Sequence, residues 1–305
     1  MTNLPERDDV TGMQTTGHEW DGITELDSPL PRWWLYIFYG TIALSVLGWI
    51  WYPSWPVWLG EWTNIKGVGG TTTREEVAAR LEAARTEREP ILERIRAMSP
   101  GDIRNDPDLL RFAVAGGESA FGDNCAPCHG SGAQGFPGYP SLVDDAWLWG
   151  GTLEAIETTL THGIRWEDDP ETRFSAMPAF VQDGILSEAD ASDVVEYVLS
   201  LSGRAEDEEA VSRGGTVFET YCTACHGPDA TGMEMVGAPN LTDQIWLYGG
   251  ERETLLETVT QGRSGVMPAW AGRLDEATIR QLALYVHSLG GGVIEADANE
   301  VSAGE

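Results

Sequence analysis

Residues 122–130 read GDNCAPCHG, and residues 219–227 read ETYCTACHG. Both stretches contain Cys-x-x-Cys-His, the pattern that attaches a c-type haem. Two thiols at this spacing can add across the two vinyl groups of one porphyrin, and the histidine that follows then faces the iron as a ligand. We therefore predict two covalently attached haem c groups, with these attachment cysteines and iron-ligating histidines: Cys125, Cys128 and His129 in the first motif, and Cys222, Cys225 and His226 in the second.

Other uses of paired cysteines fit the pattern less well. The two pairs of a four-cysteine zinc site usually lie about 15–20 residues apart, whereas Cys222 follows Cys125 by 97 positions. A thioredoxin-like redox pair would not need a histidine after both copies. A disulfide framework would scatter its cysteines through a small secreted chain. Two tight clusters in a chain of 305 residues instead indicate a prosthetic group.

The two motifs belong to a longer internal repeat. Each motif is followed by a Trp-Leu segment, WLWGGTLEAIETTLTHG at 147–163 and WLYGGERETLLETVTQG at 246–262. A Met-Pro segment comes next, AMPAF at 176–180 and VMPAW at 266–270, and each copy closes with an amphipathic helical pattern. Two copies of one all-α fold therefore follow each other along the chain.

Each repeat offers one methionine as the second axial ligand. Met177 and Met267 precede a proline at corresponding places of the repeat. We expect Met177 to complete the iron site of His129 and Met267 to complete that of His226, each within its own repeat. A soft thioether opposite histidine favours ferrous iron and raises the potential. Such an iron transfers electrons and has no vacant position for dioxygen.

Three other side chains could compete for this role. His162 could ligate the first iron, but its counterpart in the second repeat is Gln261, which cannot do the same. Met233 and Met235 follow His226 by only seven and nine residues, and the first repeat has no methionine there. We expect these two methionines to pack in a loop or against a haem edge.

A membrane-spanning helix is predicted at residues 33–52, which read WWLYIFYGTIALSVLGWIWY without a charge. Twenty helical residues span roughly 30 Å, enough for one bilayer crossing. Tryptophan and tyrosine at both ends match the aromatic belt of membrane proteins. The alternatives are a buried core helix or a signal peptide. A signal peptide would be shorter and followed by a small-residue cleavage site, which Pro53-Ser54-Trp55-Pro56 does not offer.

These patterns divide the chain into predicted parts. We expect an extended polar tail at 1–32, the membrane helix at 33–52, a spacer at 53–107, a first cytochrome domain at 108–203, a charged linker at 204–210, a second cytochrome domain at 211–291 and a disordered acidic tail at 292–305. The spacer contains a charged helical pattern from Thr73 to Met98, which Pro90 should bend or break.

The composition is strongly acidic. Forty-nine acidic residues face nineteen basic ones, for a net charge of −30, and Lys66 is the only lysine. Nucleic acid is therefore excluded as a partner, because phosphate binding needs clustered positive charge. The charge could steer a basic protein partner to a docking face, or it could serve solubility in a salty habitat; the sequence leaves both open.

Both repeats resemble the class I cytochrome c fold. The resemblance implies that the first and last helices cross where Gly117 and Phe121 in one repeat, and Gly215 and Phe218 in the other, meet the closing helices that carry Tyr197 and Tyr285. It also implies that the carbonyls of Pro140 and Pro239 accept a hydrogen bond from the ligating histidines. That contact would fix the orientation of each imidazole, as at other metal sites.

The whole chain resembles the dihaem cytochrome c subunit (subunit III, CcoP/FixP family) of cbb3-type cytochrome c oxidases. The resemblance rests on the segment GITELDSPLPRWW (22–34) ahead of a single anchor, on the two cytochrome repeats that follow, and on HGIR (162–165). It implies an electron-transfer subunit that is not catalytic on its own. Its partners would be a donor cytochrome c, a monohaem cytochrome c subunit, the catalytic haem-copper subunit and membrane lipid.

The same resemblance implies a topology. Haem is attached to Cys-x-x-Cys-His on the periplasmic side of bacterial inner membranes, so the haem domains would be periplasmic and the N-terminus cytoplasmic. Two other classes of protein stay open on the sequence. One is an anchored dihaem shuttle or dehydrogenase subunit of another respiratory complex. The other is a dihaem peroxidase, which would need one iron with an exchangeable site.

Overall fold

The computed structural model describes residues 6–52, 55–65, 67–70 and 72–293. The chain forms two compact units, Met1–Glu87 and Arg88–Glu305. The first unit contains β1 (Thr15–Trp20), β2 (Ile23–Leu26), α1 (Arg32–Trp51), β3 (Pro56–Trp58), β4 (Trp62–Asn64) and most of α2 (Thr73–Ala97). The second contains α3 (Pro100–Arg104), α4 (Pro107–Asn124), α5 (Ala126–His129), α6 (Leu153–His162), α7 (Glu188–Ser200), α8 (Glu208–Tyr221), α9 (Thr223–His226), η1 (Glu234–Val236), α10 (Arg252–Gln261) and α11 (Glu276–Ser288). Of the predicted acidic tail at 292–305, residues 294–305 lie outside the described residues.

We expected an extended tail at the N-terminus, but this segment contains a hairpin. Strands β1 and β2 pair antiparallel, and Trp20 lies opposite Ile23. The two residues between them, Asp21 and Gly22, have φ angles of 49° and 85°. Asp-Gly is a preferred pair for a two-residue turn with both φ angles positive, because glycine reaches that region without strain. The pattern was present in the sequence, and the prediction overlooked it.

Helix α1 lies within one residue of the predicted membrane span. Its side chains are exposed or half-buried, and it carries no charge after Arg32. The hydroxyls of Thr41 and Ser45 donate to the helix carbonyls of Phe38 and Thr41, both at 2.8 Å. Because these polar groups are satisfied within the helix, α1 can lie in hydrocarbon.

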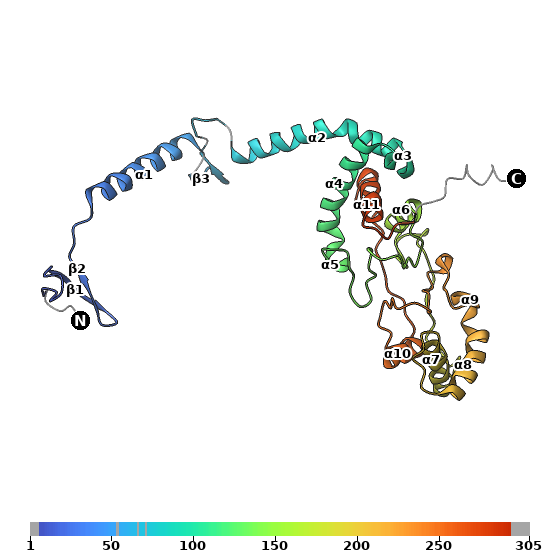
Figure 1. Ribbon diagram of the computed structural model, residues 1–305. Helices are drawn as coiled ribbons and strands as arrows, with labels where there is room; N and C mark the ends of the chain where they lie inside the picture. The colour runs from blue at the N-terminus through green and yellow to red at the C-terminus, as the bar shows by residue number, and fades with distance from the viewer. Residues whose placement is uncertain (1–5, 53–54, 66, 71, 294–305) are drawn as a thin grey trace. The chain divides into compact units, whose positions relative to one another are not determined.

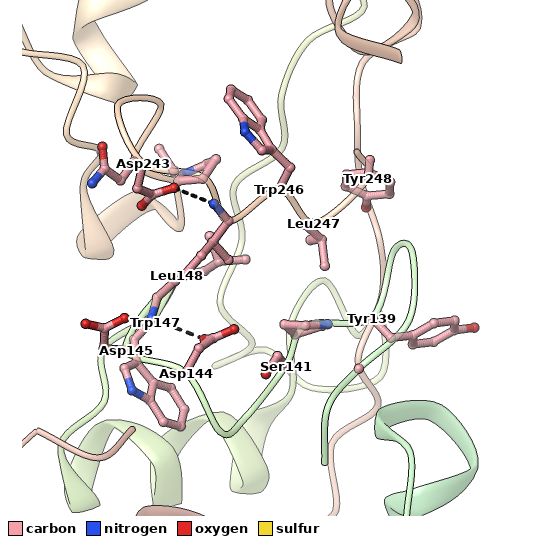
Figure 2. Close-up of a pocket in the computed structure, with 18 of the residues that line it drawn as sticks. Tyr139, Ser141, Asp144, Asp145, Trp147, Leu148, Asp243, Trp246, Leu247 and Tyr248 are labelled. Carbon is pink, nitrogen blue, oxygen red and sulfur yellow. Dashed lines mark hydrogen bonds between the residues drawn. The ribbon is translucent and has the colours of Figure 1, made fainter. Parts of the chain in front are cut away.

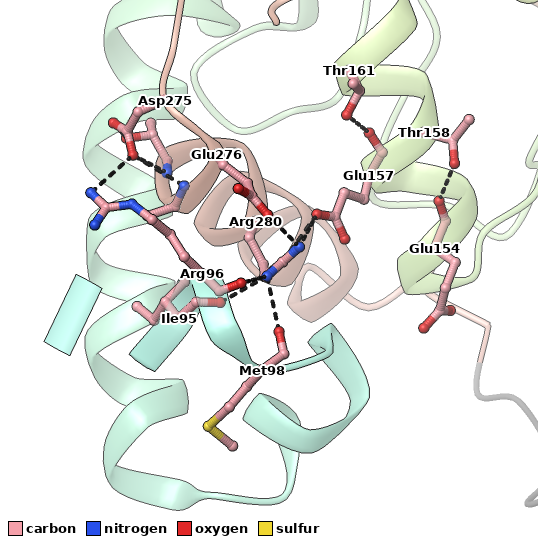
Figure 3. A network of polar contacts seen from close by, with 12 residues as sticks. Ile95, Arg96, Met98, Glu154, Glu157, Thr158, Thr161, Asp275, Glu276 and Arg280 are labelled. Atoms are coloured by element: carbon pink, nitrogen blue, oxygen red, sulfur yellow. Dashed lines mark hydrogen bonds and ion pairs between the residues drawn. The ribbon is translucent and has the colours of Figure 1, made fainter. Parts of the chain in front are cut away.

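We expected Pro90 to bend or break helix α2; the helix runs through Pro90, so the break is absent. Proline removes one hydrogen bond, the one to the carbonyl of Thr86. Both residues are exposed, so water can satisfy that carbonyl. The end of α2 is fixed by Arg280 of α11, whose guanidinium donates to the carbonyls of Ile95, Arg96 and Met98 at 2.8–3.0 Å (Figure 3).

The two repeats exchange their closing helices. Helix α4 of the first repeat packs along α11 of the second, and α8 of the second packs along α7 of the first (Figure 1). The ring of Phe121 accordingly lies 5.4 Å from that of Tyr285, and the ring of Phe218 lies 5.0 Å from that of Tyr197. Two cytochrome c folds are therefore present, but each is completed by the other repeat.

This exchange corrects the predicted role of residues 204–210. They do not link two separate domains but join α7 to α8, which pack on each other. The chain passes from one fold to the other between α6 and the Met-Pro segment of the first repeat, and again between α10 and that of the second. Two short antiparallel bridges hold it: Ile164 pairs with Met267, with N–O distances of 2.9 and 3.0 Å, and Met177 pairs with Arg263, at 3.0 and 3.1 Å.

Each fold has its own core. In one, Phe121 of α4, Ile156 of α6 and Leu282 of α11 are buried together. In the other, Val194 of α7 and Phe218 of α8 are buried with Leu255 of α10. The cores thus follow the exchanged arrangement and not the order of the repeats along the chain.

The helix crossings depend on glycine, although one of the two expected positions was wrong. A Cβ on Gly117 would lie 2.2 Å from the carbonyl oxygen of Gln281, and a Cβ on Gly214 would lie 2.0 Å from that of Asp193. A Cβ on Gly215 would meet only the ring of Tyr197, at 3.4 Å. Gly117 and Gly214 both precede the first cysteine by eight residues, so Gly214, not Gly215, is the counterpart.

Candidate haem-binding sites

The two Cys-x-x-Cys-His motifs form identical helical turns. Helix α4 ends at Cys125, and the short helix α5 carries the chain to His129, whose N–H donates to the carbonyl of Cys125 at 2.9 Å. Helices α8 and α9 repeat this arrangement, with the same 2.9 Å contact between His226 and Cys222. Each turn therefore presents both sulfurs and the imidazole from one compact piece of backbone.

The ligating histidines are held in one tautomer by proline carbonyls. Nδ1 of His129 lies 2.9 Å from the carbonyl oxygen of Pro140, and Nδ1 of His226 lies 3.1 Å from that of Pro239. Since a carbonyl can only accept, Nδ1 donates and the lone pair of Nε2 is left for iron. Burial lowers the pKa of both imidazoles, while the proline contact acts in the opposite direction. Burial thus favours the neutral form, which is the one that binds a metal.

The first cysteine of each pair is the more enclosed. Cys125 belongs to one buried core and Cys222 packs against the other, whereas Cys128 and Cys225 are exposed. Burial, with a smaller contribution from the neighbouring cysteine, raises the pKa of Cys125 and of Cys222 to about 11. These two sulfurs are therefore protonated thiols at neutral pH in the polypeptide.

The second motif opens into an apolar cavity of about 320 Å³. His226 and both its cysteines line the cavity, and so does Met177 of the first repeat. Its other walls include these apolar side chains: Phe180, Val194, Val198, Phe218, Leu241 and Leu255. An imidazole with a free Nε2, a thioether and two thiols around an apolar space are the donor set and surroundings that haem c requires. The residues present fit the group.

Met267 lies at the first motif instead of the second. It packs against the core that contains Cys125, Ile156 and Leu160. Gly163, with a φ of 68°, lets the carbonyl of Met267 approach so closely that a Cβ there would lie 2.5 Å from it. The structure thus places each methionine beside the motif of the other repeat, and not beside that of its own repeat as expected. That these methionines ligate iron stays a prediction.

His162 is engaged away from the iron sites. Its Nδ1 lies 3.1 Å from a carboxylate oxygen of Asp169, and its Nε2 lies 3.3 Å from one of Glu171. Both carboxylates come from the insertion at 166–174, which the second repeat lacks. The insertion thus accounts for a histidine here where the second repeat has glutamine.

Two arginines at the cavity of the second motif were not among the predicted site residues. Arg165 and Arg263 line it, and the guanidinium of Arg263 lies 4.5 Å from the ring centre of Tyr248. Nε of Arg165 donates to the carbonyl of Gly265 at 2.6 Å, and the same side chain also donates to the carbonyl of Ser175. Burial lowers the pKa of Arg165. The HGIR segment contained one of these residues, but nothing in the sequence indicated its position.

Another cavity, of about 740 Å³, lies where the two repeats meet (Figure 2). Corresponding residues of the two repeats line it, namely Asp144 and Asp243, Trp147 and Trp246, and Leu148 and Leu247. The carboxylates of Asp144 and Asp243 each accept from the backbone N–H two residues later, at 3.2 and 2.9 Å. Met233 also lines this cavity, whereas Met235 is 85% exposed. Pro140 and Pro239, which contact the two motif histidines, line this cavity as well, so both candidate haem sites adjoin it.

In the described part of the chain, no cluster of three or more His, Cys, Asp or Glu side chains could hold a bare metal ion. Two Cys-x-x-Cys-His turns in cytochrome folds, behind one helix long and apolar enough to cross a membrane, define the class of protein: a membrane-anchored cytochrome c.

Comparison with known proteins is more specific. Residues 12–59 match the family model described as the N-terminal domain of cytochrome oxidase-cbb3, FixP. Residues 114–202 match the cytochrome c model, and residues 209–286 match the model of subunit III of cbb3-type cytochrome c oxidase.

Curated relatives agree along almost the whole chain. A cbb3-type cytochrome c oxidase subunit CcoP from Azospirillum sp. (strain B510) is 51% identical over 294 residues, covering 94% of this chain and 98% of that protein. The CcoP subunit of Cereibacter sphaeroides is 52% identical over 278 residues, covering 91% and 95%. The FixP subunit of Bradyrhizobium sp. (strain ORS 278) is 50% identical over 293 residues, covering 96% and 100%. The chain belongs to the CcoP/FixP family of cbb3-type cytochrome c oxidase subunits.

Proposed function

We propose that this chain carries two haem c groups and transfers electrons from a donor cytochrome c to the monohaem and catalytic subunits of a cbb3-type oxidase, where dioxygen is reduced to water. It is not catalytic on its own. Its N-terminus is cytoplasmic, α1 crosses the inner membrane once, and both haem sites are periplasmic. Electron transfer as a subunit of a cbb3-type oxidase follows from the family; the number of haems, the route and the topology are the proposal.

The observation that carries the proposal is the donor set around the 320 Å³ cavity at the second motif. His226 and Met177 both line that cavity, and each belongs to a segment fixed by backbone hydrogen bonds. We assign His226 and Met177 as the axial ligands of one iron, and His129 and Met267 as those of the other. A histidine and a methionine together leave no ligand position for dioxygen. Such a site supports electron transfer and argues against a peroxidase.

Haem bound in each site supplies a reversible one-electron change at iron. The chain's residues set the conditions for it. The carbonyls of Pro140 and Pro239 hold the imidazoles with Nε2 toward the iron. The apolar walls exclude water, and the thioether favours the reduced state, so both raise the potential. Arg165 and Arg263 bring positive charge to the second site, which favours the reduced, less positive iron there.

The proposal is tested by purifying the assembly in mild detergent through a tag on this chain. We expect two haem c per copy of this chain, together with haem b and copper, and oxidation of a reduced cytochrome c by dioxygen. The chain purified alone should keep both haems, bind no carbon monoxide and reduce no dioxygen. Copurification without haem b and copper would contradict the oxidase assignment. Carbon monoxide binding to the isolated chain would contradict the ligand assignment.

A further inference from the structure

We propose that the β3–β4 hairpin is a second membrane contact, which inserts the side chains of Trp58, Leu59 and Trp62 into the lipid headgroup region beside the end of α1. The family match at residues 12–59 includes β3 but assigns no role to the hairpin, and the predicted span concerns α1 alone. The proposal rests on α1 crossing the membrane, and the experiment below tests that point separately.

The hairpin is fixed to the end of the helix. Strands β3 and β4 pair antiparallel, with Trp58 opposite Trp62 and their rings 5.6 Å apart. The chain that leaves the hairpin donates to the last carbonyls of α1: the N–H of Val68 lies 2.9 Å from the oxygen of Ile50, and that of Gly69 lies 3.1 Å from the oxygen of Trp51.

Further contacts strengthen this attachment. A Cβ on Gly67 would lie 2.1 Å from the carbonyl oxygen of Trp51, so only glycine lets the chain approach the helix end so closely. The rings of Trp49 in α1 and Trp55 before β3 pack edge-on at 5.5 Å. Because the hairpin is attached at the last turn of α1, a helix that spans the bilayer holds the hairpin at the membrane surface (Figure 1).

The face of the hairpin is apolar and exposed. Trp58, Trp62 and Leu59 are 63%, 74% and 77% exposed, and no part of the described chain covers them. An exposed apolar patch of this kind usually marks a contact with a membrane or a protein. A two-stranded hairpin is only marginally stable in water by itself. Its exposed face therefore indicates an environment other than bulk water.

Lipid is the occupant that the composition favours. Tryptophan is enriched at the headgroup level because its ring is apolar and its N–H can still bond to polar groups there. Seven of the chain's 13 tryptophans lie between residues 33 and 62. At the tip of the hairpin, Glu61 is the only charge between Trp58 and Trp62. Tryptophan is thus concentrated at the ends of the span and in the hairpin that adjoins one end.

The test uses spin labels on single cysteines introduced into the haem-loaded chain in phosphatidylcholine–phosphatidylglycerol vesicles. Labels are placed at Leu59 in the hairpin, Leu44 in the middle of α1 and Leu81 in α2, all more than half exposed. Collisions with dioxygen, which enters lipid, are compared with collisions with a water-soluble nickel chelate. The unmodified chain measures background labelling. We expect the dioxygen-to-nickel ratio at Leu59 to lie between the high value at Leu44 and the low value at Leu81.

Each outcome decides one point. A ratio at Leu59 equal to that at Leu81 would overturn the proposal, because the hairpin would then lie in water. Loss of collisions with both reagents only in the assembled oxidase would also overturn it, because another subunit would then cover the hairpin. A low ratio at Leu44 would instead refute the membrane span. We further expect W58S/W62S to lower the ratio at Leu59, and W20S, which removes an exposed tryptophan of β1, to leave it unchanged.

Discussion

Each candidate ligand is defined by its residue type and by the motif it lies next to in space. Only the residue type can be recognised from the local sequence. Met177 lies 48 positions after His129 along the chain, yet it lines a cavity with His226. In the proposed assignment, exchange of the Met-Pro segments still gives each iron one histidine and one methionine. The proposed chemistry of each site is therefore unchanged, while its methionine comes from the other repeat.

The crossed assignment predicts which haem each methionine affects. In a C125A/C128A background, only the haem at His226 remains. We expect M177A in that background to abolish the charge-transfer band of methionine-ligated ferric haem. We also expect it to lower the midpoint potential by at least ~0.1 V, a small part of the roughly 0.8 V range that axial ligands set. M267A in the same background should leave the remaining haem unchanged.

Two controls protect this experiment. M235L changes an 85% exposed methionine and should alter neither haem. If loss of the first haem destabilises the chain, NMR of the intact reduced protein gives the same information. The methyl group of Met177 should then show contacts to the porphyrin attached at Cys222 and Cys225. Contacts to the porphyrin at Cys125 and Cys128 would instead restore the pairing within one repeat.

Sequence patterns predict the ligand types because each residue type has a local signature. Cys-x-x-Cys-His forms one turn, and methionine before proline recurs in both repeats. Which methionine lies at which motif could not be predicted from the sequence, because the entropy of closing a loop changes slowly with its length. Loop length therefore does not exclude a ligand from the other repeat. The correspondence of Gly214 to Gly117 could have been predicted. Both glycines precede the first cysteine of their motif by the same number of residues.

At the scale of elements, the fold depends on two helix pairs in close contact. At Gly214 the backbone of α8 lies against that of α7 with no room for a side chain. We expect G214A to destabilise the holoprotein by about 1–3 kcal/mol, as overpacking does, and to lower the Tm by roughly 3–10 °C. G215A is the matched control. Its methyl group has room, and alanine gains up to about 1 kcal/mol over glycine inside a helix. Equal losses in both variants would refute the close approach.

Arg280 of α11 joins the end of α2 to Glu157 of α6 (Figure 3). Its side chain is 13% exposed, caps the carbonyls of Ile95, Arg96 and Met98, and lies 3.0 Å from the carboxylate of Glu157. R280M would leave that carboxylate and the last carbonyls of α2 without their donor. We expect a loss of about 2–4 kcal/mol, measured by thermal unfolding, and faster proteolysis near the end of α2.

Two variants separate the charge pair from the helix cap. E276Q removes a 62% exposed partner of Arg280 and should cost little, because exposed ion pairs contribute only about 0–1 kcal/mol. Adding E157Q to R280M should recover part of the loss, because it removes the uncompensated charge. Haem potentials should not change in any of these variants. No stability difference between R280M and E276Q would mean that the network does not hold the helix.

Element types followed from periodicity, and the misses have physical causes. Uncharged and amphipathic runs located α1, α7 and α11, because burial or lipid exposure of a whole face fixes them. The β3–β4 hairpin has strands of only three residues each, too short for an alternating pattern. The partners of the closing helices could not be predicted. Repeats of one fold present nearly equivalent surfaces, so local patterns do not distinguish a helix of one repeat from that of the other.

At the scale of the whole molecule, the exchange ties the two haem sites into one structure. Each fold lacks its methionine and closing helix without the other repeat, and both sites adjoin the cavity where the repeats meet. In the proposed function, an electron that enters at one haem site therefore has a second site nearby in the same compact unit. Electron delivery to the first haem would depend on association with the donor protein. The net charge of the chain would affect the rate of that association.

The net charge of −30 makes that encounter sensitive to salt. Electrostatic attraction extends about 30 Å at 0.01 M ionic strength but only about 8 Å at 0.15 M, and steering raises association rates by roughly 10–10³-fold. We expect reduction of the haem-loaded chain by a basic cytochrome c to slow at least ~10-fold over this salt range. Reduction by an uncharged quinol, measured by stopped flow in the same buffers, should stay constant, and an acidic cytochrome c should react faster as salt is added. If salt has no effect on the basic donor, the acidity serves solubility instead of donor recognition.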